Sequence, residues 1–288
     1  MIHKLRIVSR GKKSYLGAVP LVAYVGVFLG IPAGAVIVDA FRSASGSFTF
    51  RNIQGAMTGT YLASFVESIR LAVFSTVISA FAGLLVAIAV VGMADTRPRR
   101  AIMAASGVFA NTGGVPLAFS FIATLGNFGM LTRLLSSAGF NIYDHGFSLY
   151  STTGLTIVYQ YFLIPVMVLV MIPPLEAINE AWLEAAQTLG ATWPTIWRTV
   201  IGPVVFPPFL AASLLLFTDA FAAYATAAAL TSGVIPLVPI QIGSLIQGNV
   251  VTGEANLGSA LGFGMILIVG IVAVAYIRLS QKAQKWLR

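Results

Sequence analysis

One polar, helix-forming stretch interrupts an otherwise apolar chain, and it reads NEAWLEAAQTLGATWPTIWRTVIGPVVFPP from Asn179 to Pro208. Strong helix formers fill residues 175–189, and Gly190 suits the left-handed position that ends a helix. Thr192 can cap a second short helix, with Pro194 near its first turn. The stretch therefore predicts a helix, a sharp turn and a second helix between two apolar regions.

Composition places the rest of the chain in a membrane. The chain has 288 residues, of which 58% are hydrophobic and 9% are charged, with a mean hydropathy of +0.90. A soluble domain carries about 25% charged residues. Cysteine is absent, which excludes a disulfide framework, a zinc-thiolate site and thiol catalysis.

Six apolar stretches are long enough to cross a bilayer, which takes about 20 residues for a helix. We therefore expect an all-α membrane protein with six transmembrane helices in a single domain over residues 15–280. A basic segment, 1–14, precedes this domain and a basic tail, 281–288, follows it. The first stretch is too long for a signal peptide, so we expect an uncleaved anchor. The expected spans are 15–41, 71–93, 101–125, 153–172, 200–230 and 260–277.

Basic residues alternate between the two sides of these spans. Because cytoplasmic loops carry the excess of Lys and Arg, this pattern predicts that both termini and residues 175–198 lie in the cytoplasm. No aromatic residues interleave with the basic ones, so we expect no nucleic-acid partner. Most of the 17 basic residues lie in four places: Lys4, Arg6, Arg10, Lys12 and Lys13; Arg97, Arg99 and Arg100; Arg198; and Arg278, Lys282, Lys285 and Arg288.

The polar stretch also carries a motif. Glu184-Ala185-Ala186 is followed after three residues by Gly190 and after nine more by Val-Ile-Gly-Pro, which ends at Pro203. This resembles the EAA loop of ABC-importer permeases, in which Ile-x-Leu-Pro closes the pattern. Val200 and Gly202 stand where the family has Ile and Leu. The Gly202 departure puts local packing in doubt more than docking.

The resemblance implies a type I importer permease fold over about residues 65–280, in the inner membrane of a bacterium. It also implies two nucleotide-binding ATPase subunits that receive residues 175–198 as a coupling loop, a second permease subunit and an extracytoplasmic binding protein. The chain itself has no phosphate-binding loop, so ATP and Mg²⁺ would be used by the ATPase partner, and this chain would not be an enzyme.

The surface of the polar stretch suits a protein partner. Glu176, Glu180 and Glu184 fall on one helical face, and tryptophan is enriched among interface hot spots. The alternative is a helix lying on the bilayer, but such helices carry mainly basic residues on their polar face. We expect the ATPase to contact Glu180, Glu184, Ala185, Ala186, Gly190, Trp193 and Pro203.

Residues 111–116, Asn-Thr-Gly-Gly-Val-Pro, interrupt the third span. Proline removes a helical hydrogen bond and favours a kink, and such breaks are tolerated where they line a cavity. Close helix packing through small residues explains the same pattern. Both interpretations remain open on the sequence.

Asp219 stands near the middle of the expected fifth span, where a charge costs about 2.5–3.5 kcal/mol. Three interpretations are open for Asp219. It lines a path for a cationic solute, it forms a structural hydrogen bond or an ion pair with a second subunit, or it is a protonated acid without charge. Tyr224 could join a path only if the helix bends, because five residues rotate by about 500°. The candidate path residues are Asp219, Asn111, Tyr159, Gln160 and Tyr224.

Residues 113–119 and 222–227 resemble the spermidine/putrescine-like branch of the family, which together with Asp219 suggests a polyamine. Ferric iron, phosphonate, thiamine and oxyanions stay open. Two histidines and no cysteine predict no metal site. The rival hypotheses are a proton- or sodium-driven secondary transporter, with Asp219 as its coupling residue, and a non-transporting scaffold.

Overall fold

The computed structural model describes residues 19–247 and 255–286. Several predicted features lie outside this range. They are the basic segment 1–14, the first residues of the expected first span from Tyr15 onward, part of the loop after residue 231 and the last two residues of the tail. The described part of the chain is helical, with one isolated antiparallel bridge between Arg42 and Phe48.

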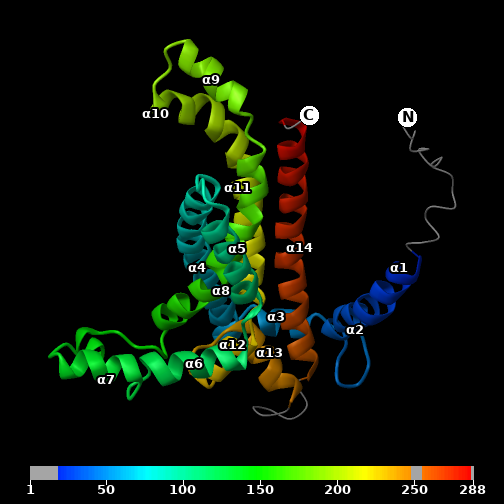
Figure 1. Ribbon diagram of the computed structural model, residues 1–288. Coiled ribbons are helices and arrows are strands. Elements are labelled where there is room, and N and C mark those ends of the chain that lie inside the picture. Colours follow the sequence, from blue (N-terminus) through cyan, green and yellow to red (C-terminus); the bar gives the residue numbers. More distant parts are fainter. Residues whose placement is uncertain (1–18, 248–254, 287–288) are drawn as a thin grey trace.

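Figure 1 shows long helices that run side by side and shorter ones gathered at their two ends. The elements are α1 (Val19–Val25), η2 (Gly26–Gly30), α2 (Ile31–Ala40), α3 (Arg51–Ala56), α4 (Gly59–Val91), α5 (Thr96–Asn111), α6 (Val115–Leu125), α7 (Met130–Ser137), η3 (Ile142–His145), α8 (Thr152–Glu176), α9 (Glu180–Thr188), α10 (Trp193–Ile196), η4 (Trp197–Ile201), α11 (Gly202–Ala222), α12 (Ala225–Thr231), α13 (Val238–Ile246) and α14 (Ala255–Trp286).

The prediction of six membrane-crossing helices is confirmed. Among the described residues, six helical segments are long and apolar enough to cross a bilayer. The second one, α4, begins well before residue 71, where the expected span began. The polar residues Ser64 and Ser68 are buried within this added part, so they face protein, and apolar periodicity alone could not include them.

Two expected spans are shorter or broken. The third span does not run unbroken from 101 to 125, because α5 ends at Asn111 and α6 begins at Val115. The segment that is long and apolar enough to cross a bilayer is instead Val115–Ser137, which lies farther along the chain than expected. The fifth does not reach residue 230, because α11 ends at Ala222 and Ala223 adopts an extended conformation. Glycine and proline explain the first break. The second lies in an alanine-rich stretch without either residue.

The core forms where α4, α8 and α11 pack together. A side chain at Gly83 of α4 would place its Cβ within 2.5 Å of the Cβ of Met167 on α8. The absence of a side chain therefore lets these two helices approach closely. Leu163, Met167 and Leu216 are fully buried in this core.

The bundle has two distinct ends. The segment α9–α10 projects at the end where α14 finishes, whereas α6, α7, α12 and α13 gather toward the other end (Figure 1). The N-terminal helices α1 and α2 lean away from the bundle in this view, and α2 contacts α14. Two candidate sites follow from this arrangement, one at the projecting segment and one among the broken helices.

Candidate functional site

The projecting segment is a helix, a turn and a second helix, as predicted. The side chain of Asn179 caps α9 by accepting the backbone N–H of Ala181 at 3.0 Å. Gly190 then adopts φ +79°. The backbone N–H of Ala191 donates to the carbonyl of Ala186 at 3.0 Å, a normal hydrogen-bond distance. Glycine suits this turn because most other residues rarely adopt a positive φ.

The motif residues divide between two faces of α9. Glu180, Glu184 and Ala185 are exposed, whereas Ala186 is half-buried and packs toward the core together with Leu183. The motif therefore presents Glu184 and Ala185 outward and uses Ala186 to hold α9 against the bundle.

The remaining predicted coupling residues lie farther along the segment. Trp193 begins α10 and is 58% exposed, and Gly190 forms the turn before it. Pro203 occupies the first turn of α11 on an exposed face. Docking on an ATPase stays a prediction for all of them.

An ion pair joins this end of the molecule to the broken helix. The guanidinium of Arg99 on α5 contacts the carboxylate of Glu176, the last residue of α8. The sequence placed both residues on the cytoplasmic side, but it did not pair them. The contact links α5 directly to the start of the projecting segment.

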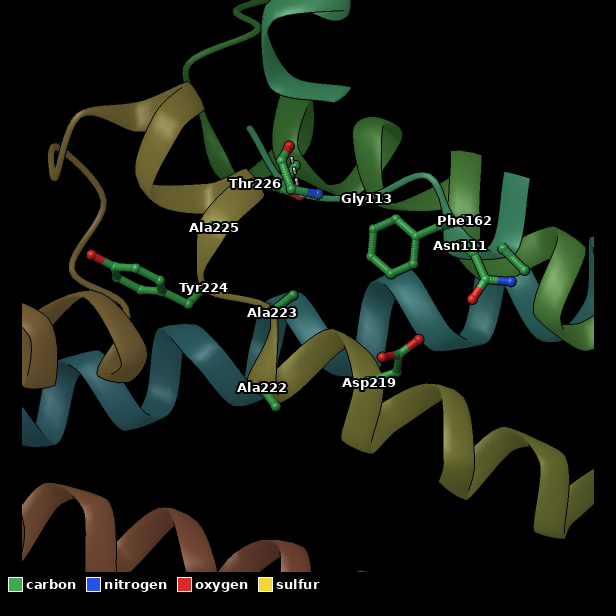
Figure 2. Close-up of a pocket in the computed structure, with 11 residues that line it drawn as sticks. Asn111, Gly113, Phe162, Asp219, Ala222, Ala223, Tyr224, Ala225 and Thr226 are labelled. Atoms are coloured by element: carbon green, nitrogen blue, oxygen red, sulfur yellow. Dashed lines mark hydrogen bonds between the residues drawn. The ribbon is translucent and has the colours of Figure 1, made fainter. Parts of the chain in front are cut away.

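The second site is a cavity of about 450 Å³ between the two helix breaks. Figure 2 shows Asp219 below this space, with Phe162 and Asn111 beside it and the chain from Ala222 to Thr226 along its edge. The structure thus brings together three predicted path residues, Asp219, Asn111 and Tyr224. The full lining is Ala110, Asn111, Gly113, Gly114, Phe162, Asp219, Ala222, Ala223, Tyr224, Ala225 and Thr226.

A single side chain holds the two breaks against each other. The hydroxyl of Thr226 accepts the backbone N–H of Gly114 at 2.8 Å and lies 3.3 Å from the carbonyl oxygen of Gly114, to which it can donate. Gly114 has φ +81° and ψ −154°, a conformation that is essentially restricted to glycine. Thr226 is 3% exposed, so these bonds form away from solvent.

Asp219 lies in the last turn of α11 rather than in the middle of a span, because the helix ends early at Ala222. Its side chain is exposed toward the cavity rather than packed in the core. Within residues 19–247 and 255–286, no ion pair includes Asp219. The C-terminal ends of α5 and α11 and the N-terminal ends of α6 and α12 all line this cavity, so their opposite partial charges offset one another and the Asp219 carboxylate is the remaining charge.

The other two predicted path residues do not line the cavity. Tyr159 is fully buried, and its hydroxyl donates to the carbonyl of Ala223 at 3.1 Å. Gln160 accepts a hydrogen bond from Ser79 at 2.6 Å and donates to the carbonyl of Thr156 at 2.8 Å. Tyr159 therefore holds the second break in place from behind, and Gln160 connects α8 with α4.

The sequence predicted that Tyr224 could join a path only if its helix bends. Tyr224 does line the cavity, because α11 ends at Ala222. Reasoning on single residues missed Phe162 and Thr226. The signal for Thr226 is the family likeness of residues 222–227, the stretch in which it lies. Phe162 carried no signal in a span rich in large apolar residues.

The chain is similar in sequence to several curated transport permeases. It is 27% identical over 133 residues to the molybdenum transport system permease protein ModB of Mycobacterium bovis, which covers 45% of this chain and 47% of that protein. It is 26% identical over 220 residues to the probable sulfate transport system permease protein cysT of Chlorokybus atmophyticus, covering 73% and 72%.

A third relative is the spermidine/putrescine transport system permease protein PotB of Haemophilus influenzae, 27% identical over 123 residues, or 42% of this chain and 41% of that protein. The match to ModB and to PotB thus spans about half the length of each relative. No protein-family model matches the chain.

Solved structures show the same fold. A bacterial ABC transporter involved in import of the acidic polysaccharide alginate aligns with TM-score 0.67 at 16% identity, over 95% of both chains. The alginate transporter in complex with its pentasaccharide-bound periplasmic protein gives 0.71 at 15% identity, over 94% of both. The inward-facing methionine transporter MetNI gives 0.54 at 17% identity, over 79% of this chain and 99% of the other.

Proposed function

We propose that this chain, which is related in sequence to ABC-importer permeases and has their fold, is a transmembrane subunit of an ATP-driven, binding-protein-dependent importer. It would form half of a translocation path and pair with a second permease subunit, identical or homologous. The cavity at Asp219 would be this chain's share of the path. The location would be the inner membrane of a bacterium, with several crossings and both termini in the cytoplasm.

The observation that carries the proposal is the continuity between the cavity and the projecting segment. Helix α8 contributes Phe162 to the cavity and ends at Glu176, just before α9. Helix α11 follows α10 and η4 without a loop and carries Asp219. A movement of the projecting segment would therefore be transmitted along two rigid helices to the cavity, a rigid-body form of switching.

The proposed partners follow from this arrangement and from the relatives. Two nucleotide-binding ATPase subunits would bind ATP and Mg²⁺ and dock on the coupling loop, 175–198. An extracytoplasmic binding protein would deliver substrate at the opposite end. The alginate transporter was solved with its periplasmic protein, which supports this part of the proposal. Nucleotide chemistry would remain in the partner subunits, so this chain would not itself be an enzyme.

The proposed substrate is a small cation of the polyamine kind. The relatives handle molybdenum, sulfate and spermidine or putrescine, so similarity alone does not choose among them. The cavity favours a cation, because Asp219 is the one charged side chain among its lining residues. This carboxylate would repel an oxyanion.

Co-purification tests the importer assignment. The tagged chain would be isolated in mild detergent and its partners identified by mass spectrometry. We expect a nucleotide-binding subunit with the wild type and its loss with Ala185→Trp, because a large side chain would block close approach of the ATPase. Ala44→Trp is a matched control, since Ala44 is exposed in the loop between α2 and α3.

The opposite outcome would favour a different mechanism. A preparation without any ATPase, under conditions that keep other membrane complexes intact, would contradict the importer assignment. Uptake into vesicles driven by a proton or sodium gradient alone would then identify a secondary transporter with Asp219 as its coupling residue. The two mechanisms are separated by whether ATP or the ion gradient drives uptake.

A further inference from the structure

A second cavity, of about 580 Å³, lies beneath the projecting segment and shares no residue with the cavity at Asp219. It is bounded by the ends of α4 and α8 on one side and by α9, α10 and η4 on the other. Its lining is Ile88, Val91, Gly92, Leu175, Glu176, Ile178, Glu180, Leu183, Trp193, Trp197 and Ile201. Of these residues, only Glu180 and Trp193 are among the predicted ATPase contacts, and the proposed transport cycle gives the cavity itself no role.

The cavity lies where two candidate membrane-crossing helices end. The membrane-crossing helix α4 ends at Val91 and α8 ends at Glu176, and both ends contribute to the lining. Six of the lining residues are aliphatic, and two of these, Leu175 and Ile201, are buried. The inner wall is therefore apolar, and the polar groups stand at the projecting segment. A pocket with mostly apolar walls and a few polar groups is typical of ligand sites.

The polar groups favour a cation. Glu176 is already neutralised by Arg99, whereas Glu180 takes part in no ion pair between described residues. The indole rings of Trp193 and Trp197 also line the cavity. Aromatic faces attract ammonium groups, and tryptophan is enriched where proteins meet lipid headgroups. One uncompensated carboxylate beside two indoles therefore provides a site for an ammonium group.

We propose that this cavity binds a phospholipid with a primary-amine headgroup, whose ammonium contacts Glu180 and the indole rings while its glycerol and upper acyl carbons lie on the apolar wall. A primary ammonium can donate hydrogen bonds to the Glu180 carboxylate, whereas a trimethylammonium headgroup has no N–H to donate and an anionic lipid brings no cation to Glu180. A free amine would leave the apolar wall uncovered. A bound aminophospholipid would hold α9 and η4 at a fixed height above the bilayer.

The competing explanation for Glu180 is local. It is the first residue of α9, and an acidic side chain in the first turn of a helix interacts favourably with the helix dipole. That role concerns only helix stability and does not distinguish one lipid from another. Lipid selectivity is therefore the readout that separates the two explanations.

The test uses native mass spectrometry of the full-length chain in mild detergent, titrated with phosphatidylethanolamine, phosphatidylglycerol or phosphatidylcholine. We expect the wild type to retain phosphatidylethanolamine most strongly. In Glu180→Gln this preference over phosphatidylglycerol should fall by about fivefold, as expected for one partly exposed ion pair. Trp193→Leu combined with Trp197→Leu should lower binding of phosphatidylethanolamine.

The same helices offer matched controls. Glu184→Gln changes an exposed acid of α9 that does not line the cavity, and Trp182→Leu changes an exposed tryptophan that does not line it. Both should bind lipid as the wild type does. Equal binding of the three lipids by the wild type would overturn the proposal, whatever the variants do.

Two other outcomes would also overturn it. If Glu184→Gln reduced the preference as much as Glu180→Gln, the effect would come from the charge of α9 and not from the cavity. If free ethanolamine displaced the lipid at equal concentration, the site would recognise a soluble amine. None of these measurements requires an ATPase or a transported substrate, so they stand apart from the test of the importer assignment.

Discussion

The hydroxyl of Thr226 lies 2.8 Å from the backbone nitrogen of Gly114, although the two residues are 112 positions apart in the chain. The bond joins the beginning of α6 to the first turn of α12. It satisfies one of the N–H groups that the beginning of a helix leaves unpaired. Two helix breaks thereby become one structural unit at the edge of the cavity.

Thr226→Val should weaken this unit. Valine keeps the shape of threonine but removes the hydroxyl, which leaves the N–H of the half-buried Gly114 without this partner at a cost of about 1 kcal/mol. Thermal unfolding of the purified chain should show the loss, and Thr226→Ser should largely restore stability. Thr231→Val is the control, since the hydroxyl of Thr231 bonds only to the carbonyl of Ala227 in its own helix. Equal effects at both positions would contradict a special role for Thr226.

Gly114→Ala should be destabilising, whereas Gly113→Ala should be tolerated. Gly114 adopts a conformation restricted to glycine, so a side chain there costs about 1–3 kcal/mol of strain. Gly113 has no atom within 4 Å of an added Cβ and no positive φ. The measurement is again thermal unfolding, together with uptake. Similar behaviour of the two variants would show that the break does not depend on the conformation of Gly114.

Asp219→Asn should reduce uptake of a cationic substrate by about tenfold or more, which corresponds to about 1.4 kcal/mol or more. The substitution keeps the size of the side chain and removes its charge. Asp219→Glu should retain more activity because the charge remains. Asp39→Asn is the control, since Asp39 lies outside the cavity and 4.0 Å from Arg42. Unchanged cation uptake by Asp219→Asn would contradict an attractive role.

Gly190→Pro should abolish assembly with the ATPase while leaving membrane insertion intact. Gly190 has φ +79°, and proline is fixed near −65°, so the turn between α9 and α10 cannot form. Gly190→Asn should retain assembly, because asparagine tolerates the left-handed conformation better than other side chains. Co-purification of the ATPase is the measurement. Normal assembly of Gly190→Pro would show that this turn is not needed for docking.

Arg99 and Glu176 should be energetically coupled. Arg99→Glu and Glu176→Arg would each place like charges together, whereas the double variant restores an opposite pair. Both side chains are partly exposed, so the stability effect should be no more than about 1 kcal/mol. A double-mutant cycle on unfolding and on ATP-driven uptake measures the coupling. Strictly additive effects in both would exclude a functional link between α5 and the projecting segment.

The sequence predicted the projecting segment better than the cavity. Asn179, Gly190 and Pro194 define the caps and the turn of α9 and α10 by their own backbone preferences. Such preferences act over a few residues and need no neighbour in space. The motif was therefore recognisable with its correct conformation.

The path residues show the opposite case. Asp219, Asn111 and Tyr224 line one cavity, whereas Tyr159 and Gln160 form hydrogen bonds to Ala223 and Ser79. A polar residue in an apolar span signals only that it faces protein or a cavity. Which of the two it faces depends on the rotation of its helix against neighbours that the linear pattern does not specify.

By itself the sequence determined that the chain has six stretches long and apolar enough to cross a membrane and a helix–glycine–helix segment between the fourth and the fifth. Both features follow from the solvent preference of side chains and from local backbone conformation. Only the tertiary structure decided that α11 ends at Ala222, that Thr226 meets Gly114 and that Arg99 meets Glu176. These contacts join residues far apart in the chain, and they exist only because particular helices pack side by side.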